Sequence, residues 1–322
     1  RGLGDVYKRQ LLTGMSDILQ FHEESIRTCQ PRSKVNRCGY GLTDLKQNNN
    51  RLHLARLFAG SEGTLGLITA ATIKTAALPE HFGSVLFFFE SIDRAAHAVQ
   101  ELSPLAPSAC DLMDRRHLSL ARESDPRYEL LIPQAAEAVL LVEFQSDSDS
   151  QVKEQLQTAV DRLQAKTNLA SGSIIAEDLL DHQMLWQLAK RFVPTLYRLK
   201  GSTRPVPVVE DIAVPPDTLP EFLPRLQQIL RTEQVTASLF GHAGHGQLHS
   251  RPFLDLANEE DGRRMKSLTE HLYHAVWEFD GTISGEHADG LSRTAYVADQ
   301  YGPLATAFAE VKSLFDPNNI LN

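Results

Sequence analysis

Patterns typical of strands and of helices take turns along most of this chain, and that alternation limits the possible folds more than any other feature of the sequence. The apolar runs at residues 85–89 and 138–142 have the length of strands, and the segments after them, 93–102 and 151–166, have helical periodicity. Further helical patterns cover residues 181–199, 219–231 and 258–279. This rhythm predicts an α+β fold.

A turn-rich stretch before residue 80 divides the chain. At 322 residues the chain is roughly twice the usual size of one domain, so two cores are expected. Residues 57–75 predict a hairpin in which the sequence LITAATIK alternates like a strand, and residues 79–82 are the expected link to a second domain. Residues 1–10, RGLGDVYKRQ, share no periodicity with the residues after them, so we expect a non-native flank and a chain cut at both ends.

Composition argues against several classes of protein. A net charge of −9 argues against nucleic acid as the main partner, because nucleic-acid binders concentrate Lys and Arg on one face. The longest apolar runs are far shorter than the about 20 residues that a membrane helix needs. Cys29, Cys38 and Cys110 form no CxxC pair, so a disulfide framework or an all-thiolate metal site is not indicated. A reducing, cytoplasmic compartment is expected.

The sequence GHAGHGQLH, residues 241–249, carries three histidines among three glycines. On a regular strand His242 and His249 would point to opposite faces, because their separation is odd, but the glycines permit a bulge that brings both to one side. Two neutral imidazoles and a carboxylate are a common catalytic zinc set. Taken alone, the motif is more often a polar surface hairpin than a metal site.

A second motif, GTISGEHADG at residues 281–290, places a carboxylate beside an imidazole. Glu286 is a candidate third ligand, and His287 is a candidate base for the proton that leaves when a hydroxy acid becomes a keto acid. A polar turn is the alternative here as well. The two motifs together favour the metal site more strongly than either does alone.

Two further segments are candidates for a binding site. LFAGSEGTLGLIT, residues 57–69, has small residues whose backbone N–H groups suit a flavin or a pyrophosphate, but its spacing is not that of a Rossmann fingerprint. VPVVEDIAVP, residues 206–215, has Glu210 and Asp211 inside an apolar strand. Buried acids need partners, so these two are either site residues or paired structural acids. The sequence leaves both possibilities open.

Taken in order, the motifs AGSEGTLGLIT, EDIAVP, FGHAGHGQLH, GTISGEHADG and FDPNNILN resemble the FAD-linked oxidase/dehydrogenase family that shares the vanillyl-alcohol-oxidase-type FAD domain. The resemblance extends over nearly everything from Val35 to Asn322. It implies the C-terminal part of that FAD-binding domain at residues 11–79. A substrate domain with a ferredoxin-like antiparallel sheet would come next at residues 80–322, and its last residues would return towards the FAD domain.

The resemblance also implies site residues. Members of the D-2-hydroxyglutarate and D-lactate dehydrogenase type hold a divalent metal, usually zinc, on residues that match His242, His249 and Glu286, and His287 matches their general base. The implied flavin contacts are Asn36, Gly39, Tyr40, Gly60, Ser61, Glu62, Gly63, Thr64, Gly66, Ile68 and Asn322.

The substrate pocket departs from the family pattern. Ala189 stands where relatives often have a carboxylate-binding Arg, and Val209 stands where some have Lys. We therefore expect Arg191, Lys200 or Arg204 to bind the substrate carboxylate in their place.

The resemblance implies FAD-dependent oxidation of a D-2-hydroxy acid to the 2-keto acid, with the hydride passing to flavin N5. 2-Hydroxyglutarate is the preferred substrate, ahead of lactate and glycolate, and the electron acceptor is expected to be other than NAD. We also expect a homodimer, peripheral membrane contact through the acceptor, and an iron–sulfur module after this region of the parent. The alternatives are a zinc hydrolase and a catalytically inert fragment.

Overall fold

A computed structural model describes residues 3–46, 51–176 and 178–322, and the chain divides into two compact units. One unit takes in the chain up to Thr75 together with Thr282–Asn322, and the other is Ala76–Gly281. We call these the split unit and the sheet unit. Each is described by itself.

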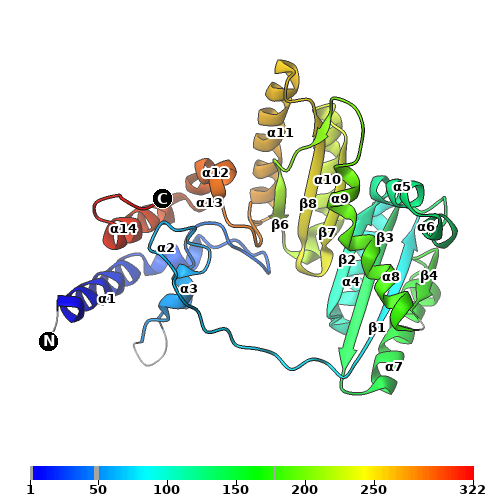
Figure 1. Ribbon diagram of the computed structural model, residues 1–322, viewed down its shortest axis with the longest axis horizontal. Helices are drawn as coiled ribbons and strands as arrows, with labels where there is room; N and C mark the ends of the chain where they lie inside the picture. The colour runs from blue at the N-terminus through cyan, green and yellow to red at the C-terminus, as the bar shows by residue number, and fades with distance from the viewer. Residues whose placement is uncertain (1–2, 47–50, 177) are drawn as a thin grey trace. The chain divides into compact units, whose positions relative to one another are not determined.

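An antiparallel sheet forms the centre of the sheet unit (Figure 1). All the strand pairings in the described residues are antiparallel. The strand order is β4 (Gly172–Ile175), β1 (His81–Phe89), β3 (Ala138–Ser146), β2 (Ala109–Asp114), β7 (Ala237–His242), β8 (Gln247–Leu254) and β5 (Arg204–Pro205), and β6 (Glu210–Ala213) also pairs with β8. This agrees with the predicted α+β class.

Helices cover the sheet on both faces, which is why β1 and β3 are buried along almost their whole length. Helix α7 lies on the face of Gly83, where an added Cβ would be 2.8 Å from Val152. On the opposite face, Leu185 of α8 packs in one cluster with Leu86 and Phe88. The helices of the sheet unit are α4 (Ile92–Leu102), α5 (Arg115–Ser124), α6 (Pro126–Leu131), α7 (Asp149–Val160), α8 (Leu179–Lys190), α9 (Phe192–Leu196), α10 (Leu219–Thr232) and α11 (Glu259–Glu278).

The split unit is helical. Its helices are α1 (Leu3–Phe21), α2 (Glu23–Thr28), α3 (Leu54–Phe58), α12 (Gly290–Arg293), α13 (Val297–Tyr301) and α14 (Ala305–Phe315). Helix α1 packs against α14 so closely that a Cβ on Gly14 would be 2.7 Å from Leu314. Residues 3–10, which the sequence indicated as a flank, continue α1. No helix in the part of the chain that the structure describes is long and apolar enough to cross a membrane.

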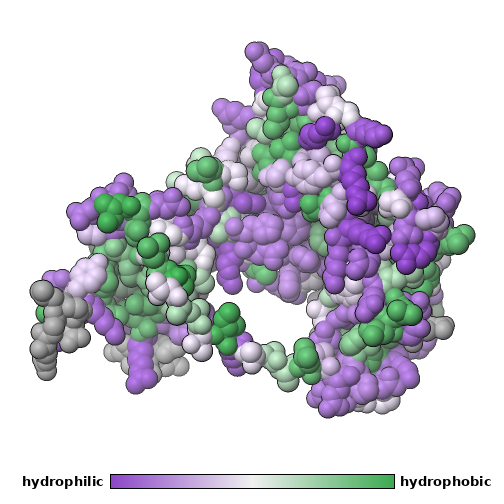
Figure 2. Space-filling model, viewed as in Figure 1, coloured by the Kyte–Doolittle hydropathy of each residue, from purple (hydrophilic) through white to green (hydrophobic). Residues whose placement is uncertain are grey.

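The prediction of a hairpin at residues 57–75 is wrong. Residues 66–79 run as an extended segment without a strand partner among the described residues (Figure 1), and Figure 2 shows apolar side chains exposed along it. Leu67, Ile68 and Ile73 are 84%, 66% and 81% exposed. A strand requires a neighbour for its N–H and C=O groups, so an alternating pattern alone does not make one.

Two other elements are shorter than predicted. The single helix expected at residues 181–199 is interrupted at Arg191, between α8 and α9. Pro194 has no N–H to donate to the carbonyl of Lys190, which ends the regular helix there. The strand predicted at 206–215 is confined to β6, where the register shifts beside Asp211, whose φ is +68°.

Candidate functional site

Several of the residues expected to contact a flavin line one cavity of about 310 Å³ in the split unit. The predicted residues at this cavity are Gly39, Tyr40, Gly60, Ser61, Glu62 and Thr64, and they are joined by Asp289, Thr294, Val297, Ala298, Ala305 and Phe308. The remaining predicted contacts, Asn36, Gly63, Gly66, Ile68 and Asn322, are not among the lining residues. Loop and helix residues from both ends of the chain therefore form one wall.

Asn36 and Asn322 stabilise the loops around this cavity. The side-chain amide of Asn36 donates to the hydroxyl of Tyr301 at 2.8 Å, and its carbonyl oxygen accepts from the backbone N–H of Cys38 at 3.1 Å. The amide of Asn322 donates to the backbone carbonyl of Glu62 at 3.1 Å. Both side chains thus make structural contacts in the split unit.

The carboxylate of Glu62 joins two of the sequence motifs. Its oxygens accept hydrogen bonds from the backbone N–H groups of Asp289 and Gly290, at 3.2 Å and 3.0 Å. The backbone N–H of Gly39 in turn donates to Asp289 at 2.8 Å. The turn around residues 59–69 and the loop at 281–290 therefore meet beside the cavity.

Burial of Asp289 raises the pKa of its carboxyl group, although the hydrogen bond from Gly39 opposes that shift. Burial, followed by the nearby Asp289, also raises the pKa of the Cys38 thiol well above its usual value. Burial therefore disfavours the charged forms of these two groups. The sequence predicted no role for Asp289, whose only signal was its place inside GTISGEHADG.

His242 and His249 lie on neighbouring strands of the sheet unit. The chain reverses between them through a short 3-10 turn, Ala243–His245, and Gly246, so they are on β7 and β8. Their ring centroids are 5.4 Å apart at an interplanar angle of 86°. The expectation that both point to one side is met by a hairpin, whereas the sequence predicted a bulge.

Each of these histidines has a carboxylate nearby. Nδ1 of His242 is 2.8 Å from Oδ1 of Asp111, and Nδ1 of His249 is 3.6 Å from Oε1 of Glu210. Glu210 also forms an ion pair with the buried Arg251. Asp211 accepts a hydrogen bond of 2.7 Å from the side chain of Gln247. The two acids that the sequence left undecided are therefore paired.

Glu286 and His287 belong to the split unit, in the loop before α12. Both side chains are about half exposed, and Nε2 of His287 is 3.6 Å from Oε1 of Glu286. The structure thus pairs the two predicted imidazole ligands within one unit, and the predicted carboxylate ligand with the predicted base within the other. The complete ligand set remains a prediction.

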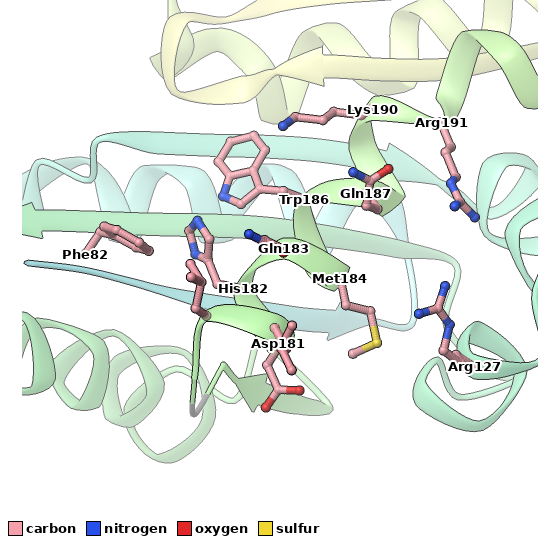
Figure 3. A pocket seen from close by; sticks show the side chains of 12 residues that line it. Phe82, Arg127, Asp181, His182, Gln183, Met184, Trp186, Gln187, Lys190 and Arg191 are labelled. Carbon is pink, nitrogen blue, oxygen red and sulfur yellow. The ribbon is translucent and has the colours of Figure 1, made fainter. Parts of the chain in front are cut away.

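The candidate substrate arginines have local partners. Arg191 at the end of α8 and Arg127 of α6 point towards each other (Figure 3), and both guanidinium groups pair with Asp125, at 3.3 Å and 2.7 Å. The hydrogen bonds from Arg127 lower the pKa of Asp125 to about 2. A cavity of about 880 Å³ extends along α8 beside them. Arg204 donates to the carbonyls of its own loop, at residues 199, 201 and 203, and Lys200 is exposed.

Known proteins resemble this chain over most of its length. The family described as FAD linked oxidases, C-terminal domain, matches residues 78–322. The D-2-hydroxyglutarate dehydrogenase of Pseudomonas putida is 30% identical over 335 aligned residues, which cover 99% of this chain and 32% of that protein. The glycolate oxidase subunit GlcD of Bacillus subtilis is 29% identical over 272 residues, which cover 84% of this chain and 56% of that protein.

The chain spans about a third of the length of the D-2-hydroxyglutarate dehydrogenases that it matches. Among solved structures, p-cresol methylhydroxylase with substrate bound has a TM-score of 0.55 and 14% identity, covering 75% of this chain and 52% of that one. At that identity the likeness shows the fold alone. It agrees with the mixed helix and antiparallel-sheet architecture.

Proposed function

This chain belongs to the FAD linked oxidases, whose C-terminal domain it contains, and we propose that the whole protein oxidises a D-2-hydroxy acid to the 2-keto acid with FAD. The observation that carries the proposal is the cavity of the split unit, which gathers the Gly-rich turn and the 281–290 loop at one wall. The named relatives supply the substrate class. A zinc hydrolase would not account for this cavity.

The walls of the cavity suit a flat cofactor. At Gly39 a Cβ would lie 2.6 Å from Phe308, so this wall has no room for a side chain. A volume of about 310 Å³ is at the lower end for a small-molecule site and would hold part of FAD. FAD held by these residues would supply the hydride acceptor for oxidation of the substrate at C2.

The candidate ligands in the motifs at residues 241–249 and 281–290 suit a divalent metal, and zinc is preferred. His242 and His249 present two imidazoles 5.4 Å apart, and Glu286 would supply the carboxylate. A metal bound there would supply a Lewis acid for the substrate hydroxyl and carboxylate. His287, next to Glu286 and about half exposed, would take the hydroxyl proton.

Of the acids in this class, 2-hydroxyglutarate is the proposed substrate, with lactate and glycolate as the alternatives. Arg191 and Arg204 are the candidates for its second carboxylate, and each would have to exchange its present partner. We further propose an electron acceptor other than NAD, a homodimer and membrane contact only through that acceptor. An iron–sulfur cluster elsewhere in the whole protein is part of the same proposal.

The direct test is anaerobic reduction of the flavin in the whole protein. We expect one of D-2-hydroxyglutarate, D-lactate and glycolate to bleach the visible flavin absorbance, and His287→Ala to slow that bleaching by about 10²–10⁴-fold, the usual contribution of a general base. The matched control is His271→Ala, an exposed histidine of α11 that pairs with Glu233 and should leave the rate unchanged. A protein without flavin, or a flavin that none of these acids reduces, would overturn the proposal.

A further inference from the structure

The register of the sheet places a buried carboxylate directly beside His242. Asp111 on β2 is the cross-strand partner of His242 on β7, so the two side chains point to the same face of the sheet. Asp111 is only 4% exposed, and its Oδ1 is 2.8 Å from Nδ1 of His242. A carboxylate can only accept a hydrogen bond, so Nδ1 of His242 carries the proton that it donates.

The hydrogen bond at one ring nitrogen decides which nitrogen of a histidine is left for other chemistry. With the proton on Nδ1, the lone pair of His242 is on Nε2. Nδ1 of His249 is 3.6 Å from Oε1 of Glu210, a carboxylate that is also paired with Arg251. The geometry at His242 is therefore that of an imidazole held for a ligand at Nε2.

We propose that Asp111 is a positioning residue, which fixes the tautomer and the ring orientation of His242 so that Nε2 is available to a divalent metal. The inference rests on the proposed function, since that proposal places the metal on His242 and His249. Acidic partners of metal-binding histidines orient the ring and raise its basicity, and their removal typically weakens metal affinity about 10–100-fold.

The tautomer is measured on the metal-free whole protein with ¹⁵N-labelled histidine. The ring signals of His242 are assigned by their loss in His242→Ala. We expect Nδ1–H in the wild type and a mixture of tautomers in Asp111→Ala. If Asp111 had a purely structural role, His242 in Asp111→Ala would keep the wild-type tautomer.

The second measurement is zinc affinity, by competition with a chromophoric chelator. We expect Asp111→Ala to bind zinc about 10–100-fold more weakly. Asp111→Asn keeps the side-chain volume and one acceptor oxygen, so it remains informative if the alanine variant unfolds, and its lost charge should still weaken binding. The control is Glu143→Gln, a buried acid on the same face of β3 that accepts from Ser108 and Trp186, and its zinc affinity should equal that of the wild type.

The possible results separate this inference from the proposal beneath it. If both Asp111 variants keep the tautomer of His242 and wild-type zinc affinity, while His242→Ala loses zinc, the positioning role is overturned and the metal site stands. If the wild type binds no zinc, the proposed metal site fails and this inference fails with it. Weaker zinc binding in Glu143→Gln as well would show a general charge effect and would also overturn the positioning role.

Discussion

Gly39 illustrates how one missing side chain determines the shape of the proposed flavin cavity. Its φ is +66°, and an added Cβ would be 2.6 Å from Cε2 of Phe308, a residue of the cavity wall. Glycine adopts a positive φ at no steric cost, whereas another residue there costs about 1–3 kcal/mol. Any side chain at this position would also move the Phe308 ring.

We expect Gly39→Ala to weaken FAD binding about tenfold, equivalent to ~1.4 kcal/mol, because the displaced Phe308 ring reduces the space for the cofactor. The flavin content of the purified protein and a titration of the apoprotein with FAD would measure this. Gly302→Ala is the matched control, since its φ is +51° but its Cβ would have no atom within 4 Å. Equal losses in both variants would show that backbone strain, and not the Phe308 ring, causes the effect.

The sequence predicted that His242 and His249 share one side of the chain, because the glycines between them permit a change of direction. It did not predict Asp111, which is 131 residues from His242 along the chain. Their contact depends on the register between β2 and β7. A register between distant strands is set by the whole sheet, and local periodicity does not contain it.

Among the elements, those with a long and regular apolar pattern were predicted well, as β1, β3 and α11 show. Strand β2 was not predicted, because its sequence ACDLMD is short and interrupted by acids. The predicted strand at residues 67–74 has the right alternation but no partner strand among the described residues. Strand formation is thus decided by neighbours that a local pattern does not reveal.

His117 joins two helices on one face of the sheet. It lies in α5, is 1% exposed, and its Nε2 contacts the carbonyl of Leu188 in α8 at 2.9 Å. Burial lowers the pKa of His117 from 6.5 to about 4. Between those two values the unfolded chain binds a proton that the folded chain does not, so this group makes the fold less stable as the pH falls.

Replacing His117 with Gln removes that titration and retains a donor for the Leu188 carbonyl. We expect the variant to be about 1 kcal/mol less stable than the wild type at pH 7. By pH 4.5 the difference in free energy of unfolding should shift in favour of the variant by about 2–3 kcal/mol, because the pKa of His117 is lower in the folded than in the unfolded chain. Burial raises the pKa of Asp114 to about 6, so this group makes the fold more stable as the pH falls. Its effect is the same in both proteins and cancels in the comparison.

Urea unfolding at the two pH values measures this difference. Trp186 and Trp277, which are the two tryptophans of the chain, both lie in the sheet unit, so their fluorescence reports on that unit. If the variant and the wild type differ in free energy of unfolding by the same amount at pH 7 and pH 4.5, His117 does not titrate between these values.

For the whole molecule, the order of five motifs predicted the family, and the match of residues 78–322 confirms it. Order along the chain is informative because each motif, taken alone, also fits an ordinary polar turn. The structure adds that residues 282–322 pack with the N-terminal segment, which leaves 76–281 as a continuous unit. His242 and His249 are inside that unit, whereas Glu286 and His287 are outside it.

A continuous chain segment with a covered sheet should fold alone, so we expect the fragment 76–281 to unfold cooperatively in urea, as its tryptophan fluorescence would show. It would retain two imidazole ligands but lack Glu286, so its zinc affinity should be at least about tenfold weaker than that of the whole protein. His242→Ala in the fragment should abolish the remaining binding. A folded fragment with the full zinc affinity would instead mean that Glu286 is not a ligand, and the carboxylate would then have to come from the sheet unit, where Glu210 lies 3.6 Å from His249.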